Sequence, residues 1–468
     1  MSEILSAFER HPDYTAEIAD EWRLMRDAYR GEVEIKRRGE IYLPMPSGYK
    51  HHPGGIDVGI AMYNAYRKRA RFPEIVSSAI RGMVGIAHGQ EWQIELPNAL
   101  MYLWENSDGK GLPLEALSKR VTKELLITGR YALLADAPPE GGDIYLAGYT
   151  AEEVINWSED DDFYVLREEI YERSGEVWTQ AIRKRVLELE DGRYVQRVYI
   201  DGVLEAEYQP RARGGSALEM IPLTIGGAMD LDLKPDTPPL AGVSRAAIAI
   251  YQNDANIRNA GYYVTQPTLV FHNVEEIPSV VGSGVALALQ AADGTKDTRA
   301  EYIVAPSDAF IPLFELLDRD HASAVRSGAQ LFDNSKGSGQ ESGQARRLRF
   351  SAETATLSSI AGASATILER TLKQAAIMAG ANPDDVIVAP PQNLLEGRLE
   401  PQEIAALLAA WKDGGISYQT LYENLQRGRI ASPERDHDEE SGLLDDEGDA
   451  NESAPDPASL AALQTLQE

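Results

Sequence analysis

The 468-residue sequence contains no cysteine. Without thiols the chain has no disulfide framework, no thiolate nucleophile and no metal site built on sulfur ligands. This composition fits a reducing compartment or a protein that avoids thiols. A disulfide-stapled domain and a cysteine-dependent enzyme are therefore excluded.

Long apolar runs are also missing, and no stretch approaches the roughly 18 apolar residues that a membrane-spanning helix needs. The first residues, MSEILSAFERHPDYTAEIADEW, carry acids where a signal peptide carries a basic region followed by an apolar run. We therefore expect a soluble protein with no signal peptide and no membrane partner.

The short motifs of common enzymes are absent as well. The sequence has no GxxxxGKS/T phosphate loop, no HExxH motif and no GxSxG elbow, and Gly282-Ser283-Gly284 lacks the third glycine of a dinucleotide site. The acidic runs Glu159–Asp162 and Asp445–Glu447 are typical of solvated surface. His51 and His52 could ligate a metal, but a loop without a nearby acidic partner favours solvated rings. We expect no enzyme, no catalytic residue, no metal and no cofactor.

Basic residues are in deficit, because 45 Lys and Arg stand against 74 Asp and Glu and leave a net charge of −29. From Glu434 to Glu468, twelve Asp or Glu accompany the single basic residue Arg435. We expect residues 433–468 to form a disordered acidic tail, since they cannot bury enough apolar surface to offset the entropy of ordering. The acidic total argues against tight DNA binding, yet it allows a protein that surrounds DNA without gripping it.

The rest of the composition is that of a globular chain, with 43% hydrophobic and 25% charged residues. The length allows about two to four domains. Apolar spacing predicts an amphipathic helix over Thr15–Tyr29, with Thr15 as a possible N-cap. A second helix begins near Ile56 and carries a basic cluster, Arg67, Lys68, Arg69 and Arg71. This cluster could contact nucleic acid, an acidic neighbouring subunit or carboxylates of its own chain.

An α+β region with a mainly antiparallel meander follows. The spacing predicts a helix over Pro113–Thr128 that Gly129 closes. Alternating apolar residues then predict several strands, at 131–135, 144–149, 163–171, 177–187, 194–200 and 203–208. The last two are joined by Asp201-Gly202, a strong signal for a two-residue hairpin.

The second half of the chain alternates long helices with short irregular segments. Gly242–Val264 predicts a helix of about 23 residues, roughly 35 Å long. Its second half is polar, which favours neighbouring subunits over a monomeric core. A β-rich stretch of about 40 residues follows, and its strand-like segments are TLVFHNV from Thr268, GSGVALAL from Gly282 and EYIVAP from Glu301. The helical segments Ser307–Phe332 and Phe350–Gly380 then flank Asp333–Ala345, a glycine-serine-rich loop that we expect to be mobile.

The order of these segments resembles the portal proteins of tailed bacteriophages, most closely a siphophage-type family long listed as a domain of unknown function. The resemblance covers roughly residues 15 to 380. The segments that carry it are YLP at Tyr42–Pro44, RKRARF, GRYALLADAP with EEVINW, GVSRAAIAIYQNDANIRNAGYYVTQPTLVF, GSG at Gly282, and SAETATLSSIAGASATILERTLKQAA.

The resemblance implies an α+β portal-like fold assembled as a ring, usually of twelve subunits. It implies a wing at 1–240, a stem helix at 241–266, a clip at 267–306, a second stem helix at 307–332, a tunnel loop at 333–349, a wing return helix at 350–400 and a crown at 401–432. Lys336, Arg346, Arg347 and Arg349 would face DNA in the channel.

The implied function is a channel for packaging and ejecting double-stranded DNA. The implied partners are the terminase large subunit, a head-tail adaptor, and the major capsid and scaffolding proteins. The protein would lie at one capsid vertex of the virion, and in the host cytoplasm during assembly. The alternatives are another component of the packaging system, namely a nuclease, a protease, or a scaffolding or adaptor protein.

Overall fold

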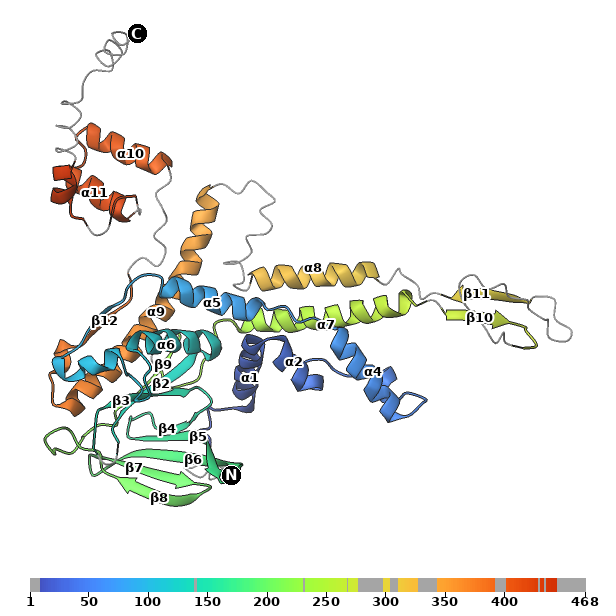
Figure 1. Cartoon of the computed structure of the whole chain (residues 1–468), viewed down its shortest axis with the longest axis horizontal. Coiled ribbons are helices and arrows are strands. Elements are labelled where there is room, and N and C mark those ends of the chain that lie inside the picture. The colour runs from blue at the N-terminus through green and yellow to red at the C-terminus, as the bar shows by residue number, and fades with distance from the viewer. Residues whose placement is uncertain are drawn as a thin grey trace, which may run out of the picture. The chain divides into compact units, whose positions relative to one another are not determined.

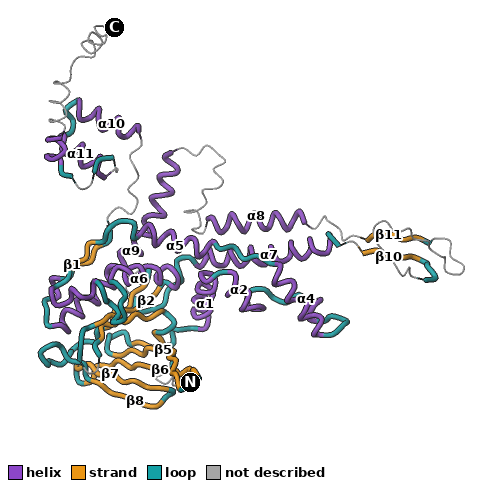
Figure 2. The backbone as a smooth tube through the Cα atoms, in the orientation of Figure 1, coloured by secondary structure: helices purple, strands orange, loops and turns teal. Residues whose placement is uncertain are grey.

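The computed structural model describes most of the chain in two compact units, residues 1–392 and 393–468. The described residues are 9–138, 141–229, 232–266, 268–276, 298–303, 310–326, 343–391, 401–427, 430–432 and 435–443. Helices and strands are mixed throughout the first unit, which confirms an α+β chain (Figure 2). Within the described residues, no helix is long and apolar enough to span a membrane.

The first unit opens with short helices that pack against one another. They are α1 (Ala16–Arg30), α2 (Glu32–Arg38), α3 (Ser47–Lys50), α4 (Ile56–Arg69) and α5 (Ile75–Ala87). Thr15 caps α1 as predicted, because its hydroxyl accepts from Ile18 N at 3.4 Å. Gly31 ends the helix with φ +89°, and a Cβ there would lie 2.5 Å from a carboxylate oxygen of Glu74.

A three-stranded sheet forms the centre of this unit (Figure 1). After β1 (Gln93–Glu95) and the 3-10 helix η2 (Asn98–Trp104), α6 (Leu114–Thr128) ends at left-handed Gly129, as predicted. The chain enters β2 (Arg130–Asp136) directly, and β3 (Tyr145–Thr150) and β9 (Leu223–Gly227) pair with it on either side. Every residue of β2 is buried.

The predicted meander is confirmed as a five-stranded antiparallel sheet. Its strands, in order, are β4 (Val154–Trp157), β5 (Phe163–Ser174), β6 (Val177–Glu190), β7 (Arg193–Ile200) and β8 (Val203–Tyr208). Asp201 and Gly202 both have positive φ, as their two-residue hairpin requires. Asp191 and Gly192 form a second turn of this kind between β6 and β7.

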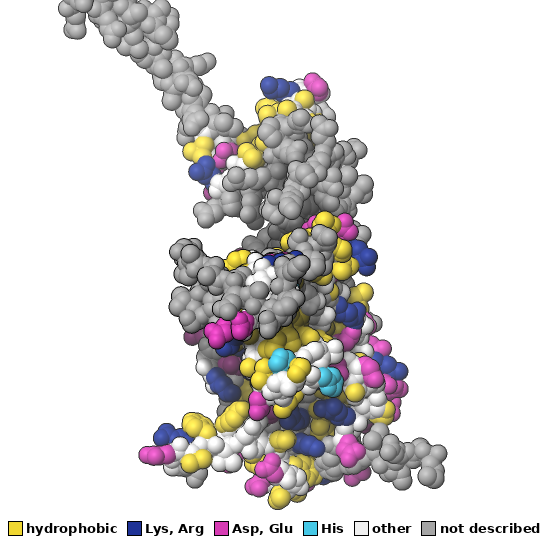
Figure 3. All heavy atoms as spheres, turned by 90° about the vertical axis from the view of Figure 1, so that its right-hand side faces the viewer, with side chains coloured by type: hydrophobic (Ala, Val, Ile, Leu, Met, Phe, Trp, Pro, Cys, Tyr) yellow, Lys and Arg dark blue, Asp and Glu magenta, His cyan; other side chains and the backbone are white. Residues whose placement is uncertain are grey.

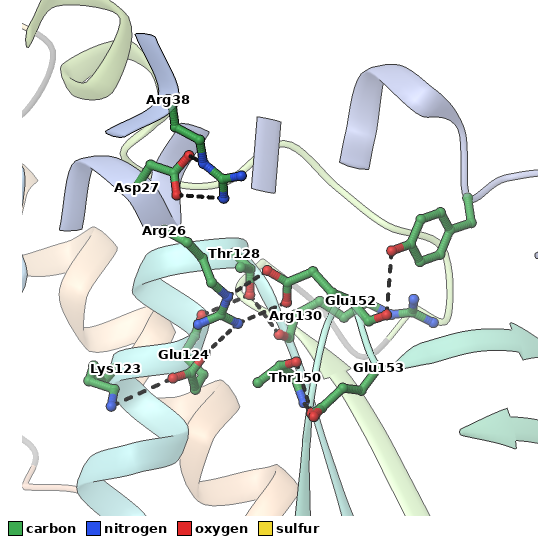
Figure 4. A network of polar contacts seen from close by, with 11 residues as sticks. Arg26, Asp27, Arg38, Lys123, Glu124, Thr128, Arg130, Thr150, Glu152 and Glu153 are labelled. Carbon is green, nitrogen blue, oxygen red and sulfur yellow. Dashed lines mark hydrogen bonds and ion pairs between the residues drawn. The ribbon is translucent and has the colours of Figure 1, made fainter. Parts of the chain in front are cut away.

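An ion network holds α1 to these sheets (Figure 4). Arg26 of α1 donates to Glu152 at 2.5 and 2.9 Å and lies 2.8 Å from Glu124 of α6. The contact with Glu124 is an ion pair without hydrogen-bond alignment. Arg38 likewise binds the buried Asp27. The two contacts of Arg26 join elements that are more than 90 residues apart in the sequence, whereas Arg38 and Asp27 join α2 to α1.

Three α-helices of the first unit follow β9, and a two-stranded ribbon lies between the first two of them in the sequence. The elements are α7 (Ala241–Val264), β10 (Thr268–His272), β11 (Arg299–Ile303), α8 (Phe310–Arg326) and α9 (Gly343–Ala379). The described side chains of α9 pack small residues closely on α6, where Thr122 Oγ1 lies 2.9 Å from Ser364 Oγ. After η4 (Pro383–Asp385), β12 (Ile387–Ala389) pairs with β1.

The second unit contains a helical pair, α10 (Pro401–Lys412) and α11 (Tyr418–Arg427), and the tilted rings of Trp411 and Tyr418 contact each other between them, with centroids 6.0 Å apart. The prediction of disorder from residue 433 onward is wrong for part of the tail, because residues 437–443 are helical. Asp436 Oδ1 caps this turn by accepting from Glu439 N at 2.8 Å, and Arg435 pairs with Glu440 at 3.1 Å. Residues 444–468 lie outside the described part.

Candidate functional site

The candidate site is the helical hairpin of α7 and α8 with the β10–β11 ribbon. The first half of α7 is anchored in the first unit, where Ser244 Oγ contacts Met25 Sδ at 2.7 Å. Its Ala246 and Ile250 share a buried cluster with Ala324 of α8. This apolar contact fixes α8 against α7, and the two helices lie side by side (Figure 1).

The ribbon follows the end of α7 and confirms two of the predicted strands. Thr268 pairs with Ile303 and His272 with Arg299, in antiparallel register. His272 Nε2 lies 2.8 Å from Glu301 Oε1 across the two strands. The predicted strand beginning at Gly282 lies outside the described residues.

The polar half of α7 is bound by its own chain, which corrects the interpretation that it requires neighbouring subunits. Tyr66 of α4 donates to Asn256 Oδ1 at 2.7 Å, and burial raises the pKa of Tyr66 to about 12, so its hydroxyl stays a donor. Asn259 meets Tyr49 and accepts from Arg69 at 2.7 Å. The polar side chains that suggested an intersubunit face are therefore largely satisfied by α3 and α4.

The basic cluster on α4 takes part in the same contacts. Arg69 lies over the ring of Tyr262 at 4.2 Å, in addition to its bond with Asn259. Arg67 lies 5.7 Å from the ring of Tyr63. Lys68 is exposed. Arg71 lies 3.6 Å from Glu32, so pairing with a carboxylate of its own chain applies to Arg71, whereas Arg67 and Arg69 contact amide and aromatic side chains of the chain instead.

Apolar side chains remain uncovered along the hairpin and the ribbon. The most exposed are Ile311 at 66%, Tyr302 at 62%, Phe314 at 51% and Ile303 at 50%. Figure 3 looks from the right-hand side of Figure 1 and shows hydrophobic side chains at the surface among Lys and Arg. Exposed apolar groups gathered on one element are typical of protein–protein interfaces. These residues were not predicted from the sequence, although the amphipathic spacing of α8 indicates that one of its faces is apolar.

The residues predicted to face DNA are only partly described. Lys336 lies outside the described residues. The backbone of Arg346, Arg347 and Arg349 forms the first turns of α9, which begins at Gly343. The predicted loop of 333–349 is therefore wrong in its last part, because the run ARRLR consists of good helix formers that extend the helix toward its N-terminus.

Metal-binding geometry is absent from the part of the chain that the structure describes. No group of three or more His, Asp or Glu side chains there could hold a metal ion. His52 Nδ1 instead accepts from Gly54 N at 3.0 Å within its own turn.

Comparison with family models gives one match in this region. Residues 239–378 match a domain of unknown function, DUF4055. The DUF4055 match begins just before α7 and ends within the last turn of α9, so it includes the hairpin, the ribbon and the predicted DNA-facing arginines. It covers less than half of the chain. A search of curated proteins finds no match.

Among solved structures, the chain is similar to components of gene transfer agent (GTA) particles. One is from the neck of the native GTA particle computed with C12 symmetry, at 12% identity and a TM-score of 0.41, covering 76% of this chain and 90% of the other. Another, from the native GTA virion, has 12% identity and a TM-score of 0.40 over the same shares. A third, from the neck of the empty particle computed with C6 symmetry, has 10% identity and a TM-score of 0.41, covering 77% and 90%.

Proposed function

We propose that this chain is a structural, non-enzymatic subunit of a phage-type particle and acts there as a portal, forming a ring around double-stranded DNA. The observation that carries the proposal is the α7–α8 hairpin with uncovered apolar side chains on α8 and the ribbon. In a ring, the flank of each hairpin would bury these side chains against the next subunit. The resemblance to portal sequences over residues 15–380 supports the same reading.

The charge of the chain suits a channel through which DNA slides. A ring of subunits that each carry a net charge of −29 would repel phosphates from most of its surface. Tight DNA binding needs a continuous basic face, and here Lys and Arg are in deficit. Passage without adhesion is the behaviour expected of such a ring.

The primary experiment is negative-stain microscopy of the purified full-length chain, with rings that have an open centre as the expected result. Ile311→Asp should abolish these rings, because assembly would bury a charge between subunits. The circular dichroism spectrum should stay unchanged, because Ile311 is 66% exposed in the single chain. Val177→Asp is the matched control, since Val177 is 65% exposed on the five-stranded sheet. Rings that persist in Ile311→Asp would contradict the assigned interface, and a monomeric wild-type chain would contradict the proposed function.

We further propose that Lys336, Arg346, Arg347 and Arg349 face DNA within the ring. Repeated around a ring, they would form a belt that holds phosphates weakly and without sequence preference. The double variant Arg346→Ala, Arg347→Ala should assemble into rings and lose retention of packaged DNA. Failure to form rings would instead assign these arginines to a subunit contact.

The β10–β11 ribbon is the proposed docking element for the terminase large subunit and, later, the head-tail adaptor. Replacing residues 268–306 with a short linker should abolish terminase binding in a pull-down while the remaining first unit still folds. Unchanged terminase binding by this variant would contradict the assignment.

A further inference from the structure

A basic cleft of the first unit is lined by residues of the three-stranded sheet and of the five-stranded sheet. Its volume is about 810 Å³, within the range of ligand-binding pockets. Four arginines line it, namely Arg183, Arg185, Arg211 and Arg213, against the two acids Asp136 and Asp143. An excess of arginine is unusual in a chain with a net charge of −29.

Two of these arginines are satisfied at the floor of the cleft. Arg185 is 7% exposed, binds Asp136 and donates to Tyr149 Oη at 2.8 Å. Burial opposes the charge of Arg185, but Tyr149 and the neighbouring carboxylates outweigh it and raise the pKa of the guanidinium. Arg183 forms an ion pair with Glu168. The charges of these two arginines are therefore already paired with carboxylates.

The other two arginines lie at the mouth and have no acidic partner among the described residues. Arg211 Nη1 donates only to Gly215 O at 3.1 Å, and no ion pair involves Arg213. Both are exposed, yet their loop is fixed. Arg213 N donates to Met378 O of α9 at 2.7 Å, and Arg211 pairs with Ala217 in an isolated bridge. Two unpaired cations are thus held in place beside a preformed cavity.

We infer that this cleft binds an acidic peptide segment. Guanidinium groups bind carboxylates in bidentate geometry, and positions held by fixed backbone lose little entropy on binding. The apolar lining side chains Pro210 and Met378 suit a peptide that also carries aliphatic residues. A long nucleic-acid backbone fits less well, because its binding needs many phosphate contacts and this cleft offers, among the described residues, only two arginines that are not already paired with acids.

The occupant we assign is the segment 434–449 of a second copy of this chain. Between residues 436 and 449 it carries eight acids and no Lys or Arg: Asp436, Asp438, Glu439, Glu440, Asp445, Asp446, Glu447 and Asp449. The adjacent Leu443 is 45% exposed and offers an aliphatic side chain. Most of the surface of another copy repels this segment, so the cleft is where charge complementarity favours it.

The test is fluorescence anisotropy of a labelled peptide of residues 434–449, titrated with the full-length chain. We expect binding that weakens as salt is raised from about 50 to 300 mM, since surface charges are screened over this range. The double variant Arg211→Gln, Arg213→Gln should bind at least about tenfold more weakly, a loss of about 1.4 kcal/mol. Arg173→Gln is the matched control, because Arg173 is also exposed and donates only to a backbone carbonyl, that of Gly175.

A second variant tests whether segment 434–449 is the occupant. In the titration, the segments 434–449 of the full-length chains compete with the labelled peptide for the cleft. Changing the eight acids between 436 and 449 of the full-length chain to their amides removes this competition. This chain should bind the labelled peptide more tightly than wild type does. Equal binding by wild type and the double arginine variant would overturn the proposal, as would displacement of the peptide by duplex DNA but not by unlabelled peptide. Ring formation is read separately by microscopy, so failure here leaves the proposed function standing.

Discussion

Arg130 is a buried cation with no ion pair among the described residues, and its replacement tests how this fold is stabilised. It is 1% exposed at the start of β2, and its three guanidinium nitrogens have no hydrogen-bond partner among the described residues (Figure 4). The guanidinium carbon lies 4.1 Å from the ring centre of Trp157, whose ring also stacks with His11 at 4.1 Å. Among the described residues, the group in direct contact with this charge is therefore an aromatic face.

The energetic consequence follows from the pKa of this group. Burial lowers the pKa of Arg130 from the ordinary value of a guanidinium to about 10, which corresponds to a penalty of roughly 3 kcal/mol for keeping the charge in the folded state. The contact with Trp157 returns up to about 2 kcal/mol. Arg130→Met removes the charge and keeps an apolar stem against the ring. We expect the free energy of unfolding to rise by about 1 kcal/mol.

Urea denaturation of the full-length chain, followed by circular dichroism, is the measurement. Because the folded pKa lies below the unfolded one, the penalty is complete below pH 10 and is relieved only as the pH rises from about 10 to 12.5. The gain in Arg130→Met should therefore be equal at pH 6 and pH 8. Arg245→Met is the exposed control, with no expected change. A loss of more than about 1 kcal/mol in Arg130→Met would refute the reasoning and show that the charge is stabilised by a bound group.

Three further predictions concern stability and can be checked by the same denaturation. Burial lowers the pKa of His88 to about 4, so the unfolded chain binds more protons than the folded chain as the pH falls from 6.5 toward 4, and the folded state loses stability. His88→Gln should therefore lose roughly 1 kcal/mol less stability than wild type between pH 7 and pH 5, after allowance for partial exposure. Gly148→Ala should destabilise by about 1 to 3 kcal/mol, because its Cβ would lie 2.0 Å from the Tyr131 hydroxyl, and adding Tyr131→Phe should recover part of the loss; equal losses with and without that change would contradict the clash. Asn256→Leu leaves the Tyr66 hydroxyl without its acceptor and should cost about 1 to 3 kcal/mol, and the matched double variant with Tyr66→Phe should cost less.

Local signals in the sequence determined many of the element boundaries. Thr15 caps α1 and Gly129 ends α6, and both effects act within one helical turn. Asp201-Gly202 forms its hairpin because both residues tolerate positive φ. The long apolar stripe of α7 was also readable, since its buried residues recur at helical spacing. Such features depend on neighbours a few residues away, and one sequence contains that information.

Tertiary structure alone decided which distant side chains meet. The polar half of α7, which includes Asn256 and Asn259, was interpreted as an intersubunit face. Their hydrogen-bond partners are instead side chains of α4 and α3, 190 and 210 residues earlier in the chain. Arg213 has no ion pair among the described residues, because the loop between β8 and β9 is fixed to the end of α9 rather than to an acidic strand. Arg130 follows a helix end, and nothing in its local sequence marks it as buried against Trp157. Pairing across the fold is set by how helices and sheets pack, and chain order does not encode that packing in any short pattern.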